Sequence, residues 1–519
     1  MTATPTAPSD AGTDPEPSPS GTGGPPGSAP RSRAGAKALV LRLHFYAGVL
    51  IAPFIFVAAF SGLLYAASVQ AEKAVYADEL RVPVGEQVLP VDEQVAAARA
   101  EYPDGAISAV RPGAEPGATT RVLLDLPELG PSHRLAVFVD PYTAEVRGAL
   151  EAYGSSGALP ARWWIDELHR NLHLGDFGRH YSELAASWLA VVAVAGVALW
   201  VGRRRGQRRV SRTLLPERGL GGRRSSLSWH GALGVWIALG LAFLAATGLT
   251  WSQHAGSNIT ELRASMSWQT PTVVSSGGGT VDEHADHGGH GEHEGHAEHE
   301  GHEGDAGGEA ADIGPELALL AAQGQGLRGP VEIGFPSGPD GQYVVKEIKA
   351  DWPTRHDAVA VDPATAVVTD TVRFEDWPVA AKLARWGVDG HMGLLFGLPN
   401  QLALIALAGA LMAVIVLGYR MWWQRRPTRG RASALAWGRP PRRGAWRRAP
   451  WAVVLPLVAL AVLVGYFVPL LGISLLAFLA VDAVLGAVAR RRRPAAIDHD
   501  HDHVPDRENA RQRGAPPGR

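Results

Sequence analysis

Four histidines of this 519-residue chain stand in two matched positions. His230 matches His44 at a sequence offset of 186, and His391 matches His169 at an offset of 222. Each lies at the edge of an apolar stretch, where an ionisable side chain usually has a function. A neutral imidazole nitrogen is an axial ligand of haem iron. A hydrogen bond to a lipid headgroup would explain one such histidine, but two matched pairs predict two sites where a pair of histidines binds a haem.

Four glycines are expected to pack against the haem groups. Two lie four positions beyond His44 and His230, about 5.4 Å along the same helix face, and two lie at an offset of 18, about 27 Å along a helix. A missing side chain lets a flat macrocycle approach the backbone. Close helix packing through small residues is the alternative. The four are Gly48, Gly234, Gly62 and Gly248.

Other histidines compete for these roles. His173 and His180 share a face with His169 if residues 164–181 form one helix. The position that matches His173 at the 222 offset is Leu395, so we expect His169 to be the ligand and keep His173 as the second choice. Three unmatched histidines are expected to be ordinary loop or surface residues that could line a substrate surface. They are His133, His254 and His356.

Membrane helices are expected to carry these residues. About 20 apolar residues in a helix span the roughly 30 Å hydrocarbon layer. The predicted fold class is a polytopic α-helical membrane protein with about six transmembrane helices, the last two forming a hairpin over 451–489. The spans are expected at residues 38–68, 182–202, 229–252, 396–423, 451–469 and 471–489.

Arginine sets the expected orientation in the cytoplasmic membrane. Residues 203–228 and 424–450 hold nine Arg each, with one acid in the first segment and none in the second. Such loops stay in the cytoplasm, so 69–181 and 253–395 face the outside. Both ends are then cytoplasmic, the first as a disordered tail and the last as a basic tail containing histidine. These tails are expected at residues 1–37 and 490–519.

The chain is a tandem duplication of helix, external segment and helix. Residues 139–144 (VDPYTA) recur as 361–366 (VDPATA), and Trp164 recurs as Trp386, all at the 222 offset. Each external segment is expected to form a small α+β module, with a helix such as 91–102 on an antiparallel sheet. Strands are expected at 120–126, 133–139, 331–335, 342–348 and 358–361. The same offset relates Gly196 to Gly418 and Trp200 to Trp422.

The second copy is longer than the first, because the offset grows from 186 to 222 along the repeat, and most of the excess is a histidine-rich insert at 275–311. Histidine recurs there at every third position among Glu, Asp and Gly, a composition that builds no core. The insert is either a loose chelator of a divalent metal such as zinc, copper or nickel, or a solvated low-complexity loop. Its histidines are His284, His287, His290, His293, His296, His299 and His302.

Several other kinds of chemistry lose support. The chain has no Cys, which excludes disulfides, thiolate catalysis and iron–sulfur clusters. A net charge of −2 gives no reason to expect a nucleic-acid partner. The external segments show no nucleophile with its base, no phosphate-binding glycine loop and no dinucleotide fingerprint. We therefore predict no catalytic residues of those kinds.

Three motifs together resemble the PepSY-associated transmembrane family. The resemblance covers about residues 38–427, and the external Asp-Pro-x-Thr segments resemble PepSY modules. The insert and the closing helix pair depart from the family pattern, which leaves metal and substrate open. The motifs are His44-x3-Gly48 with Ser61-Gly62-Leu63, Leu168-His169-Arg170-Asn171-Leu172 with Gly175-Asp176-Phe177-Gly178, and Gly390-His391-x-Gly393-Leu394 with Gly397-Leu398-Pro399.

This resemblance implies two b-type haems, with His44, His230, His169 and His391 as ligands. Relatives include iron-regulated membrane proteins and ferric-siderophore reductases, which pass electrons outward across the membrane. The leading hypothesis is therefore a reductase of extracytoplasmic ferric complexes such as siderophore-iron. Because no flavin or nicotinamide motif is visible, a quinol or a cytoplasmic flavoprotein is the expected donor.

Two rival hypotheses remain. The chain could be a non-catalytic metal-binding PepSY membrane protein that captures or senses metal or regulates a peptidase. A transporter is weaker, because no polar residues form a readable pathway through the helices.

Overall fold

A computed structural model of the protein describes residues 29–204, 211–274, 312–338, 340–425 and 451–491. Contacts divide the chain into two compact units, Met1–Gly472 and Ile473–Arg519. Outside the described residues lie the expected first tail up to residue 28, the histidine-rich insert 275–311, the second arginine-rich segment from 426 to 450, and the last tail from residue 492.

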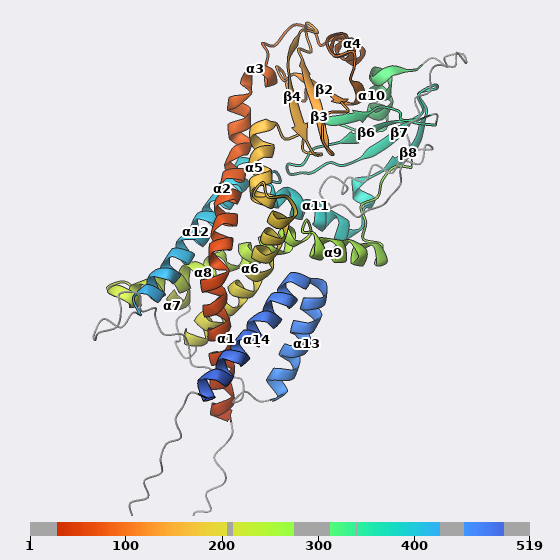
Figure 1. The fold of residues 1–519 in the computed structure, drawn as a ribbon. Coiled ribbons are helices and arrows are strands. Elements are labelled where there is room, and N and C mark those ends of the chain that lie inside the picture. Colours follow the sequence, from red (N-terminus) through yellow and green to blue (C-terminus); the bar gives the residue numbers. More distant parts are fainter. Residues whose placement is uncertain (1–28, 205–210, 275–311, 339, 426–450, 492–519) are drawn as a thin grey trace, which may run out of the picture. The chain divides into compact units, whose positions relative to one another are not determined.

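Five described helices are long and apolar enough to cross a membrane (Figure 1). The expected fifth span, α13 (Trp451–Phe467), contains only a shorter apolar helix, so length and composition support five of the six predicted spans. The first span is divided between α1 (Ala29–Leu50) and α2, and α1 begins inside the range expected to be a disordered tail. The five are α2 (Ala52–Val75), α6 (Gly175–Arg204), α8 (Gly222–Leu249), α12 (Leu398–Trp423) and Pro469–Val488 of α14 (Pro469–Arg491).

Four of these helices, α2, α6, α8 and α12, pack together around an apolar core. Ile55 of α2, Ile237 and Leu241 of α8 and Leu411 of α12 belong to that core. Large apolar side chains such as Leu239 stay exposed on the outside of the bundle. A helix that is apolar all round is typical of a membrane span.

The two segments between the spans together form one antiparallel sheet of eight strands, in the order β4-β3-β2-β1-β5-β6-β7-β8. Five strands lie at the expected positions, whereas β1, β4 and β8 were not expected. The strands are β1 (Ala106–Arg111), β2 (Thr120–Asp125), β3 (His133–Val139), β4 (Val146–Tyr153), β5 (Val331–Gly334), β6 (Tyr343–Glu347), β7 (Ala358–Val361) and β8 (Val368–Val372).

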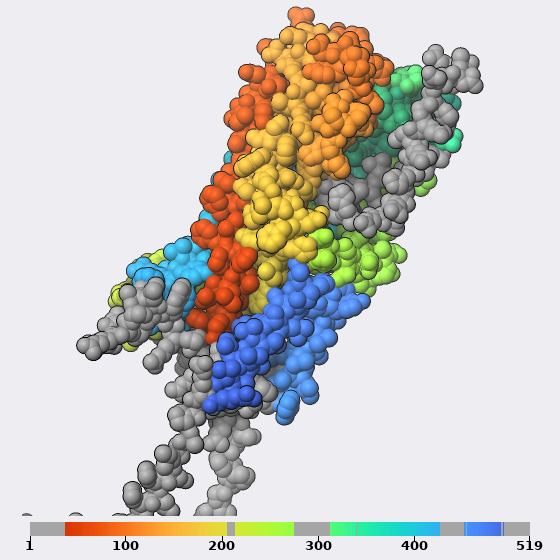
Figure 2. Space-filling model, in the orientation of Figure 1, coloured from red at the N-terminus to blue at the C-terminus, as the bar shows by residue number. Residues whose placement is uncertain are grey.

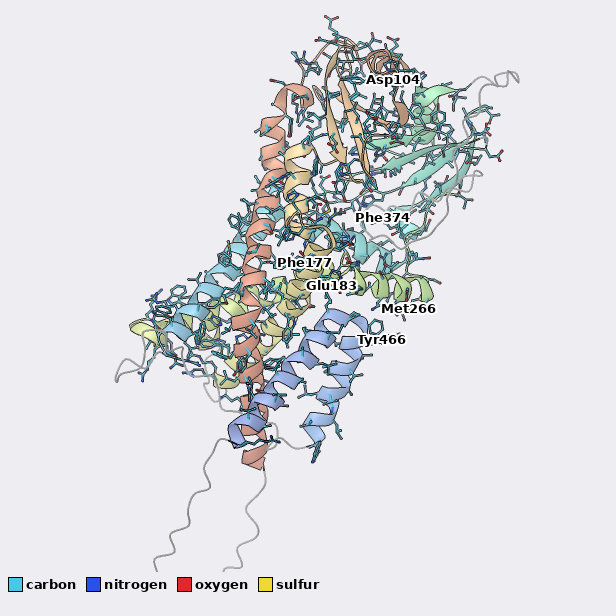
Figure 3. The ribbon with its side chains drawn as sticks, in the orientation of Figure 1. Asp104, Phe177, Glu183, Met266, Phe374 and Tyr466 are labelled. Carbon is cyan, nitrogen blue, oxygen red and sulfur yellow. The ribbon has the colours of Figure 1, made fainter. Side chains whose placement is uncertain are left out.

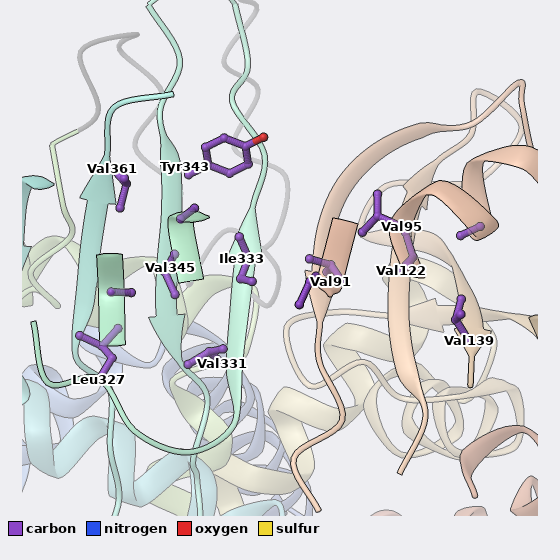
Figure 4. Close-up of a cluster of buried hydrophobic side chains, with 14 of the residues drawn as sticks. Val91, Val95, Val122, Val139, Leu327, Val331, Ile333, Tyr343, Val345 and Val361 are labelled. Carbon is purple, nitrogen blue, oxygen red and sulfur yellow. The ribbon is translucent and has the colours of Figure 1, made fainter. Parts of the chain in front are cut away.

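The halves of the sheet meet where β1 pairs with β5, as Ala109 does with Gly334. Helices α4 (Val91–Glu101) and α10 (Gly314–Gly324) share one apolar core with both halves (Figure 4). The strands of the two expected α+β modules therefore form two halves of one sheet. Pairing β1 with β5 satisfies backbone groups that two separate modules would leave on open edges.

Helix α5 (Pro160–Asn171) leads from β4 to α6, and α11 (Val379–His391) leads from β8 to α12. On the face drawn in Figure 2, α5 and α6 lie beside α2, which both contact. Residues 164–181 do not form one helix, because Leu172 and His173 have φ values of 56° and 55°. A left-handed backbone cannot continue a right-handed helix. The remaining helices are α3 (Ala77–Leu80), α7 (Ser211–Leu214), α9 (His254–Ser265) and the 3-10 helix η1 (Phe374–Asp376).

Candidate functional site

The structure brings the matched histidines together as two facing pairs. His44 of α1 and His230 of α8 have ring centroids 6.2 Å apart, with the ring planes at 77°. His169 of α5 and His391 of α11 have centroids 6.4 Å apart, with the planes at 48°. We call these the first and the second histidine pair.

Both separations suit two imidazoles on opposite sides of one metal ion. A metal–nitrogen bond of about 2.0–2.1 Å and about 1.2 Å from nitrogen to ring centre put the two centres roughly 6.4 Å apart. The observed 6.2 and 6.4 Å agree with that distance. The first pair meets edge to face, and centre distances of this size also occur between aromatic rings in direct contact.

In the first pair, backbone carbonyls orient both rings. The Nδ1 atom of His44 lies 3.1 Å from the carbonyl oxygen of Val192, and that of His230 lies 2.9 Å from the oxygen of Val414. A carbonyl oxygen only accepts, so each Nδ1 carries the hydrogen and each Nε2 keeps its lone pair. A second hydrogen bond of this kind is typical of metal-bound histidines.

In the second pair, hydroxyl groups take the place of the carbonyls. Ser61 Oγ lies 2.9 Å from Nδ1 of His169, and Thr247 Oγ1 lies 2.7 Å from Nδ1 of His391. Each hydroxyl also donates to a carbonyl of its own helix, that of Val57 for Ser61. Its single proton is thereby used, so it accepts from Nδ1–H, and Nε2 again keeps a lone pair.

Glycines make room for the rings. A Cβ at Gly62 would lie 3.0 Å from Cε1 of His169, and one at Gly248 would lie 3.6 Å from Cε1 of His391. Both glycines therefore pack on the imidazoles, and both also line the cavity at the second pair. Gly48 lines the cavity at the first pair with open space in front of it, as does its partner in the repeat, Gly234.

Sequence reasoning missed the equivalent glycines of the first pair. A Cβ at Gly196 would lie 3.1 Å from Cε1 of His44, and one at Gly418 would lie 3.5 Å from Cε1 of His230. The signal that could have found them is their recurrence at the same 222 offset that relates His169 to His391.

Each pair lines a cavity with mainly apolar walls. Basic side chains line the cavity of the first pair, and no acid is found among its described lining residues. Arg170 and Arg179 line the cavity of the second pair, together with Asp166 and Glu183. Apolar walls with cations fit a flat apolar macrocycle that carries carboxylates. The cations of the first cavity are Lys37, Arg203, Arg223 and Arg425.

Burial keeps the second pair neutral. It lowers the pKa of His169 below its usual value. Burial, and next the neighbouring His169, lower the pKa of His391 to about 3. Because only a neutral imidazole offers a lone pair to a metal, both rings are ready to bind one at neutral pH.

His173, the second choice, lies elsewhere. Its ring packs on Trp164 at 4.7 Å and its Nδ1 lies 3.6 Å from Glu167, and it does not line the cavity of the second pair. The left-handed turn after α5 separates it from His169. The part of the chain that the structure describes contains no group of three or more His, Asp or Glu fit to hold a metal ion.

Comparison with known proteins agrees with this architecture. Residues 41–425 match the family described as the PepSY-associated TM region. The match includes both histidine pairs and the whole sheet, and it ends before α13. No curated protein matches the chain. Because the match covers most of its length, this protein belongs to the PepSY-associated transmembrane family.

Proposed function

We propose that this protein is a dihaem electron-transfer protein of the cytoplasmic membrane that reduces ferric complexes, such as siderophore-iron, outside the cell. The observation that carries this function is the pair of facing imidazoles, found twice, with ring centres 6.2 and 6.4 Å apart and each Nδ1 hydrogen-bonded, so that Nε2 would be the nitrogen to hold a haem iron. His44 and His230 would hold one haem b, and His169 and His391 the other. When bound, haem supplies one-electron transfer.

The two pairs lie at opposite ends of the helix bundle. Gly62 packs on His169 and stands at an offset of 18 from His44, about 27 Å at the rise of a helix. Gly248 packs on His391 and has the same offset from His230. That distance is close to the roughly 30 Å hydrocarbon layer, so one pair belongs near each membrane face.

The cavities approach each other inside the bundle. Four apolar residues line both of them, one each from α2, α6, α8 and α12. Groups held in the two cavities are therefore separated by side chains of a single layer, which favours electron transfer between them. The four residues are Ile55, Leu189, Leu241 and Leu411.

The residues of this chain have distinct tasks in such a protein. The Nδ1 hydrogen bonds fix the tautomer and the direction of each imidazole. Arginines such as Arg179 and Arg425 would bind the haem carboxylates. The apolar walls exclude water and keep the imidazoles neutral, which supports ligation.

The arginine-rich segments indicate the proposed direction of electron transfer across the membrane. Residues 203–228 run from the last residues of α6 into the first turns of α8, next to the first pair, and positive segments stay in the cytoplasm. The first pair would therefore take electrons from a quinol or a cytoplasmic flavoprotein. The second pair, on the side of the sheet, would deliver them to the ferric complex. Both chain ends would be cytoplasmic.

An optical spectrum of the full chain purified in detergent tests this function. We expect sharp low-spin b-type bands after dithionite reduction, at about two haems per chain. Reoxidation of the reduced protein by a ferric siderophore should then be visible in the same bands. A colourless protein, expressed with sufficient haem, would contradict the proposal.

A further inference from the structure

A third pair of histidines lies apart from the two pairs described above. His180 of α6 and His254 of α9 have their Nε2 atoms 3.2 Å apart and their ring centroids 5.1 Å apart. Both rings are partly exposed. The repeat places Leu402 opposite His180, at the 222 offset, and Ser68 opposite His254, at the 186 offset. The duplication therefore does not account for this pair, which occurs once.

The spacing of the two nitrogens suits one metal ion bound from adjacent directions. Two metal–nitrogen bonds of about 2.0–2.1 Å that enclose an angle of about 100° place their nitrogens roughly 3.2 Å apart. The first and second histidine pairs have ring centres farther apart, at 6.2 and 6.4 Å. The shorter spacing of His180 and His254 therefore suits a bare ion rather than a macrocycle.

We propose that His180 and His254 form a binding site for a first-row transition-metal ion of the Cu²⁺ and Zn²⁺ class. Imidazole nitrogen is a preferred ligand of these ions, and Cu²⁺ binds most tightly among them. The site does not depend on bound haem.

Both residues are held in place by contacts at other atoms, and their Nε2 atoms share a hydrogen bond at 3.2 Å that a bound ion would replace. His180 Nδ1 lies 2.6 Å from the carbonyl oxygen of Asp176, so it carries the hydrogen and Nε2 keeps the lone pair. Glu183 accepts from the backbone N–H of His254 at 2.9 Å and of Ala255 at 3.1 Å. That carboxylate is buried and ties the first turn of α9 to α6, as its place beside α9 in Figure 3 illustrates.

The site borders the cavity of the second histidine pair. Arg179 and Glu183, next to His180 on α6, line that cavity, and so do Trp251 and Ser252, just before His254. No third His, Asp or Glu of the described residues completes a ligand group. The ion would keep positions open for water or for an incoming ligand, as catalytic rather than structural metal sites do. It would be exchangeable and close to the second haem.

Copper titration of the full chain tests this site. The ten histidines outside the described residues would compete for metal, so each is changed to Ser in the background protein. They are His284, His287, His290, His293, His296, His299, His302, His499, His501 and His503. Electron paramagnetic resonance of this background with one equivalent of CuSO₄ should show coupling to two imidazole nitrogens.

Variants of the pair complete the test. H180Q and H254Q should each weaken Cu²⁺ binding by about tenfold or more, measured by calorimetry, because each removes one of two protein ligands. H173Q is the matched control, because His173 lies on the same external side and packs on Trp164 instead. Equal binding in the background and in the H180Q/H254Q double variant would overturn the site, as would a copper spectrum without two coupled nitrogens.

The outcome is separable from the haem proposal. H180Q and H254Q should leave the haem content unchanged, whereas the H169A/H391A double variant should keep the copper signal. Unchanged copper binding in H180Q/H254Q would therefore count against this site alone, and unchanged haem content in H169A/H391A would count against the haem proposal alone.

Discussion

The imidazoles of His169 and His391 face each other at 6.4 Å although they belong to different copies of the repeat, far apart in the chain. Each ring packs on a glycine of the preceding span and is hydrogen-bonded to the hydroxyl one residue before that glycine. His169 and His391 therefore make the same two contacts, each through the equivalent ring atom. This match of contacts supports one metal ion held between the two rings more strongly than the sequence repeat does.

Removing the second histidine pair should remove one haem. We expect H169A/H391A to lose about half of the bound haem and all reductase activity, because the first pair stays intact at the other end of the bundle. Haem per chain and ferric-siderophore reduction measure the two effects. H173A, outside the cavity, is the control and should keep both haems. Full haem content in H169A/H391A would exclude these residues as ligands.

The two glycines of the second pair should respond differently to a methyl group. A Cβ at Gly62 would come within 3.0 Å of the His169 ring, which must then move, whereas at Gly248 it would make an ordinary 3.6 Å contact with His391. We expect G62A to weaken haem retention at the second pair and G248A to be nearly neutral. Haem loss to apomyoglobin measures retention. Equal behaviour of the two variants would show that the rings are free to shift.

The same reasoning applies to the hydroxyl of Ser61. S61A deprives Nδ1–H of His169 of its acceptor, whereas S61T keeps a hydroxyl there. Loss of such a partner typically costs 10–100-fold, or about 1.4–2.7 kcal/mol, in binding at a metal site. Potentiometric titration should show S61A shifting the midpoint of one haem and S61T shifting neither. A shift of both midpoints in S61A would argue against a local effect.

A buried ion pair should stabilise the junction of the sheet. Arg111 of β1 donates from Nε to Glu332 of β5 at 2.6 Å, and both side chains are under a tenth exposed. We expect R111M to destabilise the protein by about 3–5 kcal/mol, because it leaves Glu332 buried with one cation fewer. The double variant R111M/E332M should recover most of that loss. Thermal unfolding compares the three proteins, and equal loss in both variants would contradict the prediction.

Acid should weaken the junction of the sheet. Burial alone raises the pKa of Glu332, but the charges of Arg111 and Lys346 outweigh it and hold the pKa well below its usual value. A lowered folded pKa means that the pair contributes fully above the unfolded pKa of about 4.3, and that this contribution is lost progressively as the pH falls from there through the lower folded value. Glu332 should therefore make the wild type lose stability as the pH falls below about 5, a loss that a carboxylate with an unshifted pKa would not add. Unfolding of the wild type and of R111M/E332M at pH 6 and pH 3 compares the two losses, and an equal loss in both proteins would contradict this.

Deleting residues 282–303 separates the reductase from a metal-binding regulator. The deletion removes the seven histidines of the insert and none of the residues at either histidine pair. A reductase should keep its haem spectrum and much of its activity, whereas a metal-capture protein should lose its function. Haem content and reduction rate of the deletion variant, compared with those of the full chain, decide between them.

The sequence by itself determined five of the membrane spans, five of the eight strands of the sheet and the residues that correspond in the two repeats. Apolar length locates α6, α8 and α12, and alternation locates strands such as β3, because both signals are local in the chain. The repeat offset distinguished His169 from His173 without any geometry. The same offset relates Gly196 to Gly418, and it could have identified both as glycines that pack on the first histidine pair.

Only the tertiary structure decided which groups meet across the chain. The joining of β1 to β5 and the approach of His180 to His254 depend on packing between segments that are distant in the chain, for which the sequence has no periodic signal. The turn at Leu172 and His173 depends on a backbone conformation that these residue types rarely adopt. The carbonyl and hydroxyl partners of each Nδ1 belong to neighbouring helices, so their identity follows from helix packing rather than from any local pattern.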